Sequence, residues 1–71
     1  MDYWERIKAL REDNDITQSV MAKHLNIAQN TYSQYETGKR EVPLDILVEI
    51  CRYFDVSSDY ILGLSDKKEH T

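Results

Sequence analysis

The sequence predicts an all-α fold, a compact bundle of five helices. Its 71 residues have room for one small domain. Two glycines and one proline leave little room for a hairpin-rich β fold. Apolar residues recur instead at spacings of three and four, between residues that are suited to begin or end helices. We assign the domain to residues 1–64 and expect the polar, charged residues 65–71 to form a frayed tail.

The first two predicted helices are separated by a segment that favours a turn. The first helix should end near residues 13–15, because Asn and Asp tolerate the left-handed conformation that a helix end often needs. Thr17 is a good N-cap for the second helix, residues 18–25, and Asn26 is suited to end it. Each helix has one apolar face, formed by Tyr3, Trp4, Ile7 and Leu10 in the first and by Met21, Ala22 and Leu25 in the second.

The third predicted helix starts at about Ala28 and ends before Gly38, which suits the position after a helix C-terminus. Only a short turn separates it from the second helix. The two helices should therefore cross steeply, and Ala22 is the small residue that allows them to pack. The inside of this corner should be filled by five side chains, Met21, Leu25, Ile27, Tyr32 and Tyr35.

The fourth and fifth helices complete the predicted bundle. Pro43 is acceptable at the start of the fourth. Five apolar residues at helical spacing define its expected buried face: Leu44, Leu47, Val48, Cys51 and Phe54. Ser57 is suited to cap, and Gly63 to end, a short fifth helix over residues 58–62. We interpret Cys51 as a small core residue rather than as a nucleophile or a redox sensor.

The segment from residue 18 to residue 38 resembles the helix-turn-helix of the phage repressor and Cro-like proteins, the XRE family. The resemblance extends from about Ile7 to Leu62 and implies the repressor-like form of the five-helix bundle. It departs from the family pattern at Ala28, where a Ser or Thr cap is common. Its landmarks are Leu10-Arg11, Thr17-Gln18, Met21-Ala22, Leu25, Tyr35-Glu36-Thr37-Gly38-Lys39-Arg40 and Phe54-Asp55-Val56-Ser57.

This resemblance implies sequence-specific binding of double-stranded DNA, with the third helix in the major groove. The outward face of that helix is uncharged and rich in amides, which suits base reading because Gln and Asn can bond in bidentate fashion to adenine. Five residues are the candidate base readers: Ala28, Gln29, Asn30, Ser33 and Gln34. Four others are candidate phosphate contacts, the first of them by the family's pattern: Gln18, Lys23, Lys39 and Arg40.

The distribution of charge agrees with this placement. The net charge of −4 by itself argues against nucleic-acid binding. Residues 17–40, however, carry three basic residues, Lys23, Lys39 and Arg40, and a single acidic one, Glu36. The resemblance pairs Glu36 with Arg11 in a structural ion pair, which would remove that charge from the groups that repel phosphate.

Other classes of function have less support in the sequence. No nucleophile–base pair and no carboxylate cluster indicates an enzyme, and Cys51 with two histidines makes no metal-ligand set. We expect no cofactor, no metal and no small-molecule ligand. No apolar run could span a membrane, and one unpaired cysteine fits the reducing cytoplasm. The main alternative is a protein-interaction module of the antitoxin or antirepressor type on the same fold, which the acidic net charge favours.

Apolar residues left outside the predicted core indicate a second contact surface. They are Val20, Ile46, Tyr53, Tyr60 and Leu64. We expect a homodimer through Tyr53, Tyr60 and Leu64, because a dimer reads two half-sites about 34 Å apart on an operator with two-fold symmetry. We expect repression by occlusion of polymerase rather than activation, because the sequence shows no ligand domain and no obvious acidic activation surface.

Overall fold

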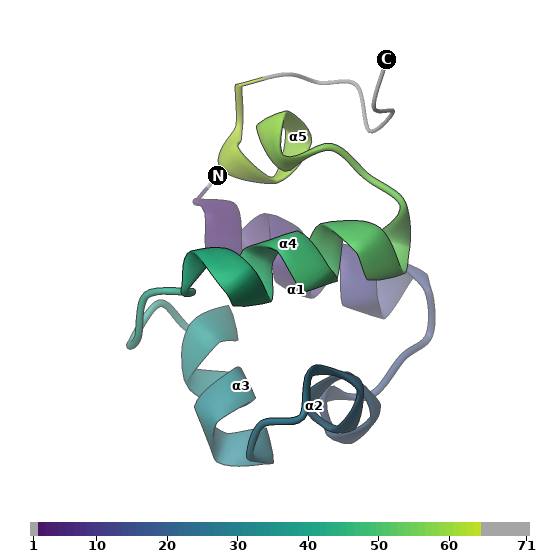
Figure 1. The fold of residues 1–71 in the computed structure, drawn as a ribbon, viewed down its shortest axis with the longest axis vertical. Coiled ribbons are helices and arrows are strands. Elements are labelled where there is room, and N and C mark those ends of the chain that lie inside the picture. Colours follow the sequence, from purple (N-terminus) through teal and green to yellow (C-terminus); the bar gives the residue numbers. More distant parts are fainter. Residues whose placement is uncertain (1, 65–71) are drawn as a thin grey trace.

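The computed structural model describes residues 2–64, which form five helices and no strand (Figure 1). The helices are α1 Tyr3–Asp13, α2 Gln18–Leu25, α3 Gln29–Glu36, α4 Leu44–Phe54 and α5 Ser58–Leu62. This confirms the predicted all-α, five-helix fold. Within the described range, no helix has both the length and the apolar character that crossing a membrane requires. The tail predicted at residues 65–71 lies outside the described residues.

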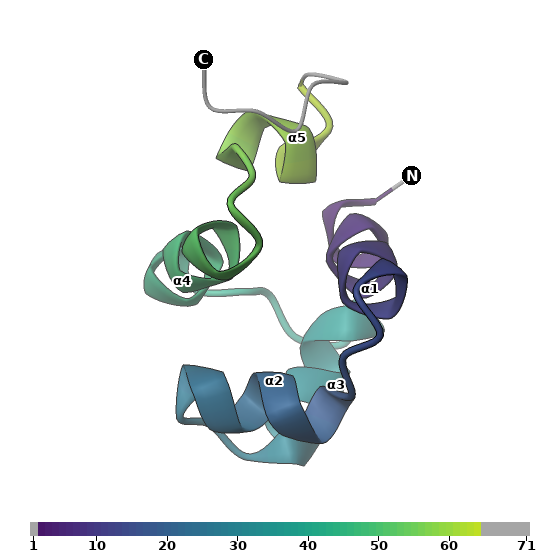
Figure 2. The ribbon, with the colours of Figure 1, turned by 90° about the vertical axis from the view of Figure 1, so that its right-hand side faces the viewer.

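The five helices are arranged around a central pair. In Figure 2, α1 and α4 lie on opposite sides of the bundle, with α2 and α3 at one end and α5 at the other. The helix α1 packs against both α3 and α5, while α2 packs against α3 and α4. The α2–α3 pair is therefore held on the bundle from two sides and forms one end of the molecule.

The helix ends are set by the residues that the sequence singles out. The hydroxyls of Thr17 and Ser57 accept hydrogen bonds from backbone N–H groups three residues later, at 3.2 and 3.1 Å. Asn26 ends α2 in the left-handed conformation, with a φ of 58°. Gly38 and Gly63 follow α3 and α5 with φ of 76° and 81°. The ends of these short helices are thus set by side-chain caps and by residues that adopt the left-handed conformation.

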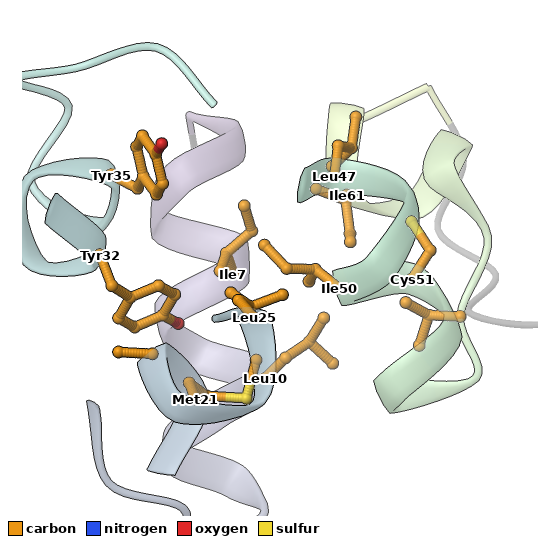
Figure 3. Packing of buried hydrophobic residues seen from close by; sticks show 12 residues of the cluster. Ile7, Leu10, Met21, Leu25, Tyr32, Tyr35, Leu47, Ile50, Cys51 and Ile61 are labelled. Carbon is orange, nitrogen blue, oxygen red and sulfur yellow. The ribbon is translucent and has the colours of Figure 1, made fainter. Parts of the chain in front are cut away.

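The core joins all five helices (Figure 3). Its largest fully buried side chains are Tyr32, Ile7, Met21, Ile50 and Ile61. The expected filling of the corner is confirmed: Met21, Leu25, Tyr32 and Tyr35 are buried, and Ile27 is half-buried.

Cys51 is also a core residue, as expected. Its side chain lies among the buried apolar side chains in Figure 3. Burial raises the pKa of the Cys51 thiol. The reactive thiolate is therefore disfavoured at this position, and the interpretation as a packing residue is confirmed.

The predicted buried face of α4 is partly wrong. Leu44 and Val48 are 76% and 39% exposed, whereas Ile50, which was not assigned to that face, is fully buried. Ile46, expected outside the core, is half-buried and packs against it. Apolar residues occupy more than half of the circumference of this helix, so helical spacing fits two overlapping arcs. The core takes in Leu47, Ile50 and Cys51, with Ile46 and Phe54 packed against it, and leaves Leu44 and Val48 in solvent.

Candidate nucleic-acid interface

A sharp corner joins α2 to α3. The N–H of Ile27 donates to the carbonyl of Ala22 at 3.0 Å, and Asn26 takes the left-handed conformation between the helices. Ala22 is buried, as its expected place at the helix crossing requires. Tyr32 and Tyr35 point into the core, so the opposite face of α3 is turned outward (Figure 3).

The outward face of α3 presents amide side chains to solvent. Gln29 and Asn30 are exposed, and Ser33 and Gln34 are half-buried. Together with Gln18 of α2 they line an open depression of about 550 Å³. The structure thus brings four candidate base readers and one candidate phosphate contact onto a single surface.

Gln18 is held there by a polar network that links three parts of the chain. Its Nε2 donates to Oε1 of Glu36 at 3.0 Å. The same carboxylate accepts from Nε and Nη2 of Arg11, at 2.7 and 3.0 Å, while Nη1 of Arg11 donates to the carbonyl of Ile16 at 2.7 Å. The side chains of Arg11 and Glu36 are only 11% and 1% exposed. The ion pair that the resemblance implies is therefore present, as a buried bidentate contact between α1 and α3.

The network keeps the Glu36 carboxylate ionised. Burial alone raises the pKa of this carboxyl, but its contacts with Arg11, Tyr32 and Gln18 outweigh burial and hold the pKa below its ordinary value. The hydrogen bond to Glu36 raises the pKa of Arg11. Burial, followed by the neighbouring Glu36, raises the pKa of Tyr32 far above its usual range. The one acidic residue of α3 is thus neutralised by Arg11 and turned away from the outer face.

The basic candidates lie at two separate places. Lys39 and Arg40 are exposed just after α3, and their backbone N–H groups donate to the carbonyl of Gln34 at 3.0 and 3.3 Å. The Nε of Arg40 also donates to Oε1 of Gln34 at 3.0 Å. Lys23 is exposed in the last turn of α2. It lies roughly 140° around the helix from Gln18, so the structure does not bring it to the depression.

Ala28 and two unforeseen contacts complete the surface. Ala28 is exposed at the N-cap of α3 and makes no side-chain capping bond, as its departure from the family pattern suggests. Sequence reasoning missed the bonds from Gln18 to Glu36 and from Arg40 to Gln34. In each bond the two residues do not share a helix, so no helical periodicity marks them.

The residues expected to form a dimer interface are only partly available. Tyr53 is half-buried, with its ring centroid 4.4 Å from that of His24. Tyr60 is half-buried too, and the guanidinium of Arg6 lies 5.1 Å from the centre of its ring. Leu64 is 76% exposed.

A different apolar surface lies along α4. It is an open groove of about 270 Å³ that follows the exposed side of this helix toward the start of α5. The two exposed apolar residues of α4, which the sequence placed in the core, form part of its wall. The lining residues are Leu44, Leu47, Val48, Cys51, Arg52, Val56 and Ser58.

Two helices that meet at a sharp corner, with an amide-rich outer face on the second, define a helix-turn-helix domain. The chain belongs to the XRE-type helix-turn-helix family, whose family model matches residues 7–61. The resemblance inferred from the sequence is thereby confirmed.

Two relatives show what kind of protein carries this domain. The uncharacterized HTH-type transcriptional regulator YobD of Bacillus subtilis (strain 168) is 42% identical over 64 residues, which are 90% of this chain and 57% of that protein. The HTH-type transcriptional regulator ImmR of the same organism is 36% identical over 73 residues, covering 100% of this chain and 58% of its own length. The chain thus spans less than two thirds of these relatives. Both are named as regulators, which agrees with the expectation that the chain is not an enzyme.

A solved structure shows the same fold on DNA. The P22 c2 repressor protein in complex with a synthetic operator has a TM-score of 0.82 and 26% identity, over 92% of this chain and 98% of that chain. The repressor-like form of the bundle is therefore confirmed.

Proposed function

We propose that this chain binds double-stranded DNA sequence-specifically through the α2–α3 corner and regulates transcription as a repressor. The observation that carries this proposal is the outer face of α3, a solvent-accessible surface of uncharged amides. Glu36, the only acidic residue of that helix, is buried and paired with Arg11. The relatives named as transcriptional regulators and the repressor–operator structure support the proposal.

In the proposed complex α3 lies in the major groove. Phosphate contacts fix the register of the protein, and base contacts select the sequence. Gln18 is the first residue of α2, where the helix dipole and free backbone N–H groups favour a phosphate. Lys39 and Arg40 hold the backbone beside α3, and Lys23 holds it further along α2. The base readers are Ala28, Gln29, Asn30, Ser33 and Gln34.

Replacement of Gln29 and replacement of Lys39 should have different effects on binding. The Gln29→Ala variant should lose about 1–3 kcal/mol of discrimination at one base pair, because a bidentate contact to that base is lost. The Lys39→Ala variant should bind all sequences more weakly and reduce the salt dependence of binding by about one unit. Selection from a random DNA pool, followed by gel shifts at several salt concentrations, measures both effects.

The Glu49→Gln variant is a suitable control, because residue 49 is an exposed position on α4, away from the α2–α3 corner. It should leave base preference unchanged. If both Gln29→Ala and Lys39→Ala bind as the parent chain does, the assignment of the interface is wrong. If the parent chain shifts no DNA duplex in the gel, a second candidate function is favoured, a protein-interaction module. The net charge of −4 is the observation that supports it.

The proposed protein acts as a homodimer in the cytoplasm, where DNA is present and a lone thiol such as that of Cys51 stays reduced. We place the second copy over the groove along α4, rather than at Tyr53 and Tyr60. In an antiparallel contact of two α4 helices centred on Val48, Arg52 of each copy lies beside Asp45 of the other. Two-fold symmetry thus brings Arg52, which pairs with Glu49 in its own helix, next to a second acidic residue twice over.

Leu44→Glu should leave the chain folded, because Leu44 is 76% exposed in the free protein. It should abolish the dimer, because the carboxylate of the new glutamate would be buried against an apolar groove of the second copy. Sedimentation at micromolar concentration should show the parent chain as a dimer and the variant as a monomer. Val20→Glu, at an exposed apolar position of α2 that does not line the groove, should leave the mass unchanged. A parent chain that is a strict monomer with and without DNA contradicts the dimer.

A further inference from the structure

Gln34 is tied to Arg40 through both main chain and side chain. The carbonyl of Gln34 accepts the backbone N–H groups of Lys39 and Arg40, at 3.0 and 3.3 Å. The hydroxyl of Thr37 donates to the same carbonyl at 3.3 Å. In addition, Nε of Arg40 donates to the side-chain oxygen of Gln34 at 3.0 Å. The segment after α3 is therefore folded back onto Gln34, and Arg40 occupies the acceptor end of its carboxamide.

This bond changes what Gln34 can offer to a base. A free carboxamide has an acceptor oxygen and a donor NH₂, and bidentate binding to adenine needs both. With its oxygen directed at Arg40, Gln34 has only one lone pair left on that oxygen, and its NH₂ group is the end that remains free to approach a base. In the major groove, guanine presents two acceptors, N7 and O6, and thymine presents one, O4. Adenine instead presents one acceptor, N7, beside a donor, the N6 amino group, and the oxygen held at Arg40 is turned away from that donor.

We propose that Arg40 is a specificity-determining residue, which holds the oxygen of Gln34 and leaves its NH₂ group toward the bases, so that Gln34 selects guanine, and after it thymine, over adenine. The inference rests on the proposed function, since it concerns the same DNA-binding surface. Arg40 keeps Nη1 and Nη2 for a phosphate, so one residue serves both contacts. It thereby couples the position of the DNA backbone to the identity of a base.

Gln29 and Asn30 provide an internal comparison. Neither side chain makes a hydrogen bond within residues 2–64, so both keep donor and acceptor for a base. The same helix should therefore combine adenine-type reading by Gln29 at its first turn with guanine-type reading by Gln34 at its last.

The test compares sequences selected from a random duplex pool by the full 71-residue chain and by three variants. Gln34→Ala identifies the base position read by Gln34, because preference is lost there. At that position the parent chain should select guanine. Arg40→Ala should raise the ratio of adenine to guanine by about tenfold, since the freed oxygen can then accept from adenine. Lys39→Ala, the neighbouring basic residue, should weaken binding while keeping the guanine preference.

The outcomes separate this inference from the proposed function. The inference is overturned if the parent chain selects adenine at the Gln34 position, or if Arg40→Ala lowers affinity without changing the preference there. A change of preference at the Gln29 position as well also overturns it, because it would indicate a general distortion of α3. If the parent chain selects no sequence at all, the proposed function itself fails. Circular dichroism establishes that each variant is folded.

Discussion

Replacing Glu36 with glutamine is expected to lower the free energy of unfolding by about 3 kcal/mol. The side chains of Glu36 and Arg11 are 1% and 11% exposed, so the substitution leaves a buried guanidinium without its counter-charge. For a domain of this size, such a loss lowers the melting temperature by about 12–24 °C. Urea titration and thermal unfolding followed by circular dichroism measure both quantities.

The exposed ion pair of α4 is a matched control. Glu49 and Arg52 lie 3.2 Å apart, with side chains 49% and 73% exposed. Glu49→Gln should therefore change the free energy of unfolding by less than about 1 kcal/mol. The double variant Arg11→Met with Glu36→Met should recover most of the lost stability, because it removes both buried charges. If Glu36→Gln loses less free energy of unfolding than Glu49→Gln does, the structural role of the Arg11–Glu36 pair is contradicted.

The pH dependence of stability has a definite sign. The pKa of Glu36 in the folded chain lies below its ordinary value of 4.5, so the ion pair stabilises the fold fully only above that pH. As the pH falls through the lower, folded-state pKa, the carboxylate is protonated and this stability is lost. The difference in stability between the parent chain and Glu36→Gln should therefore shrink below about pH 4.5. The same urea titrations at several pH values measure it.

Local chemistry explains why most of the fold could be predicted. Thr17 and Ser57 each precede a helical pattern and cap the helix that follows. Asn26 and Gly38 adopt the left-handed conformation after a helix. These helix boundaries therefore depend on neighbouring residues alone. The buried arc of α4 does not. Leu44 and Val48 have the same apolar character as the buried Leu47 and are exposed only because the other helices pack on a different side.

The candidate site shows the same division. That α3 turns its amides outward could be predicted, because Tyr32 and Tyr35 mark the inward face. Which atoms of those amides are free could not. Arg40 reaches Gln34 only after Gly38 reverses the chain, and the bond depends on that loop conformation rather than on a periodic spacing.

Gly38→Ala is the second substitution with a large expected effect, about 3 kcal/mol of stability. Gly38 has a φ of +76°, and a left-handed conformation costs an L-residue roughly 1–2 kcal/mol. A Cβ at this position would also lie 2.6 Å from Cε2 and 2.7 Å from Cζ2 of Trp4, and such overpacking adds about 1–3 kcal/mol. Gly38 connects α3 to Lys39 and Arg40. A backbone shift that relieves the clash with Trp4 would displace these two residues and should therefore also weaken DNA binding.

Gly63 separates the two causes. Its φ is +81°, but the nearest atom to an added Cβ would be Nε of Arg6 at 3.9 Å, an ordinary contact. Gly63→Ala should therefore lose only about 1–2 kcal/mol, the part due to backbone conformation. In a Trp4→Ala background, Gly38→Ala should lose no more than this, because the indole that meets the methyl group is gone. Equal losses at both glycines in the parent chain, or an unchanged loss without Trp4, would show that backbone conformation alone accounts for Gly38.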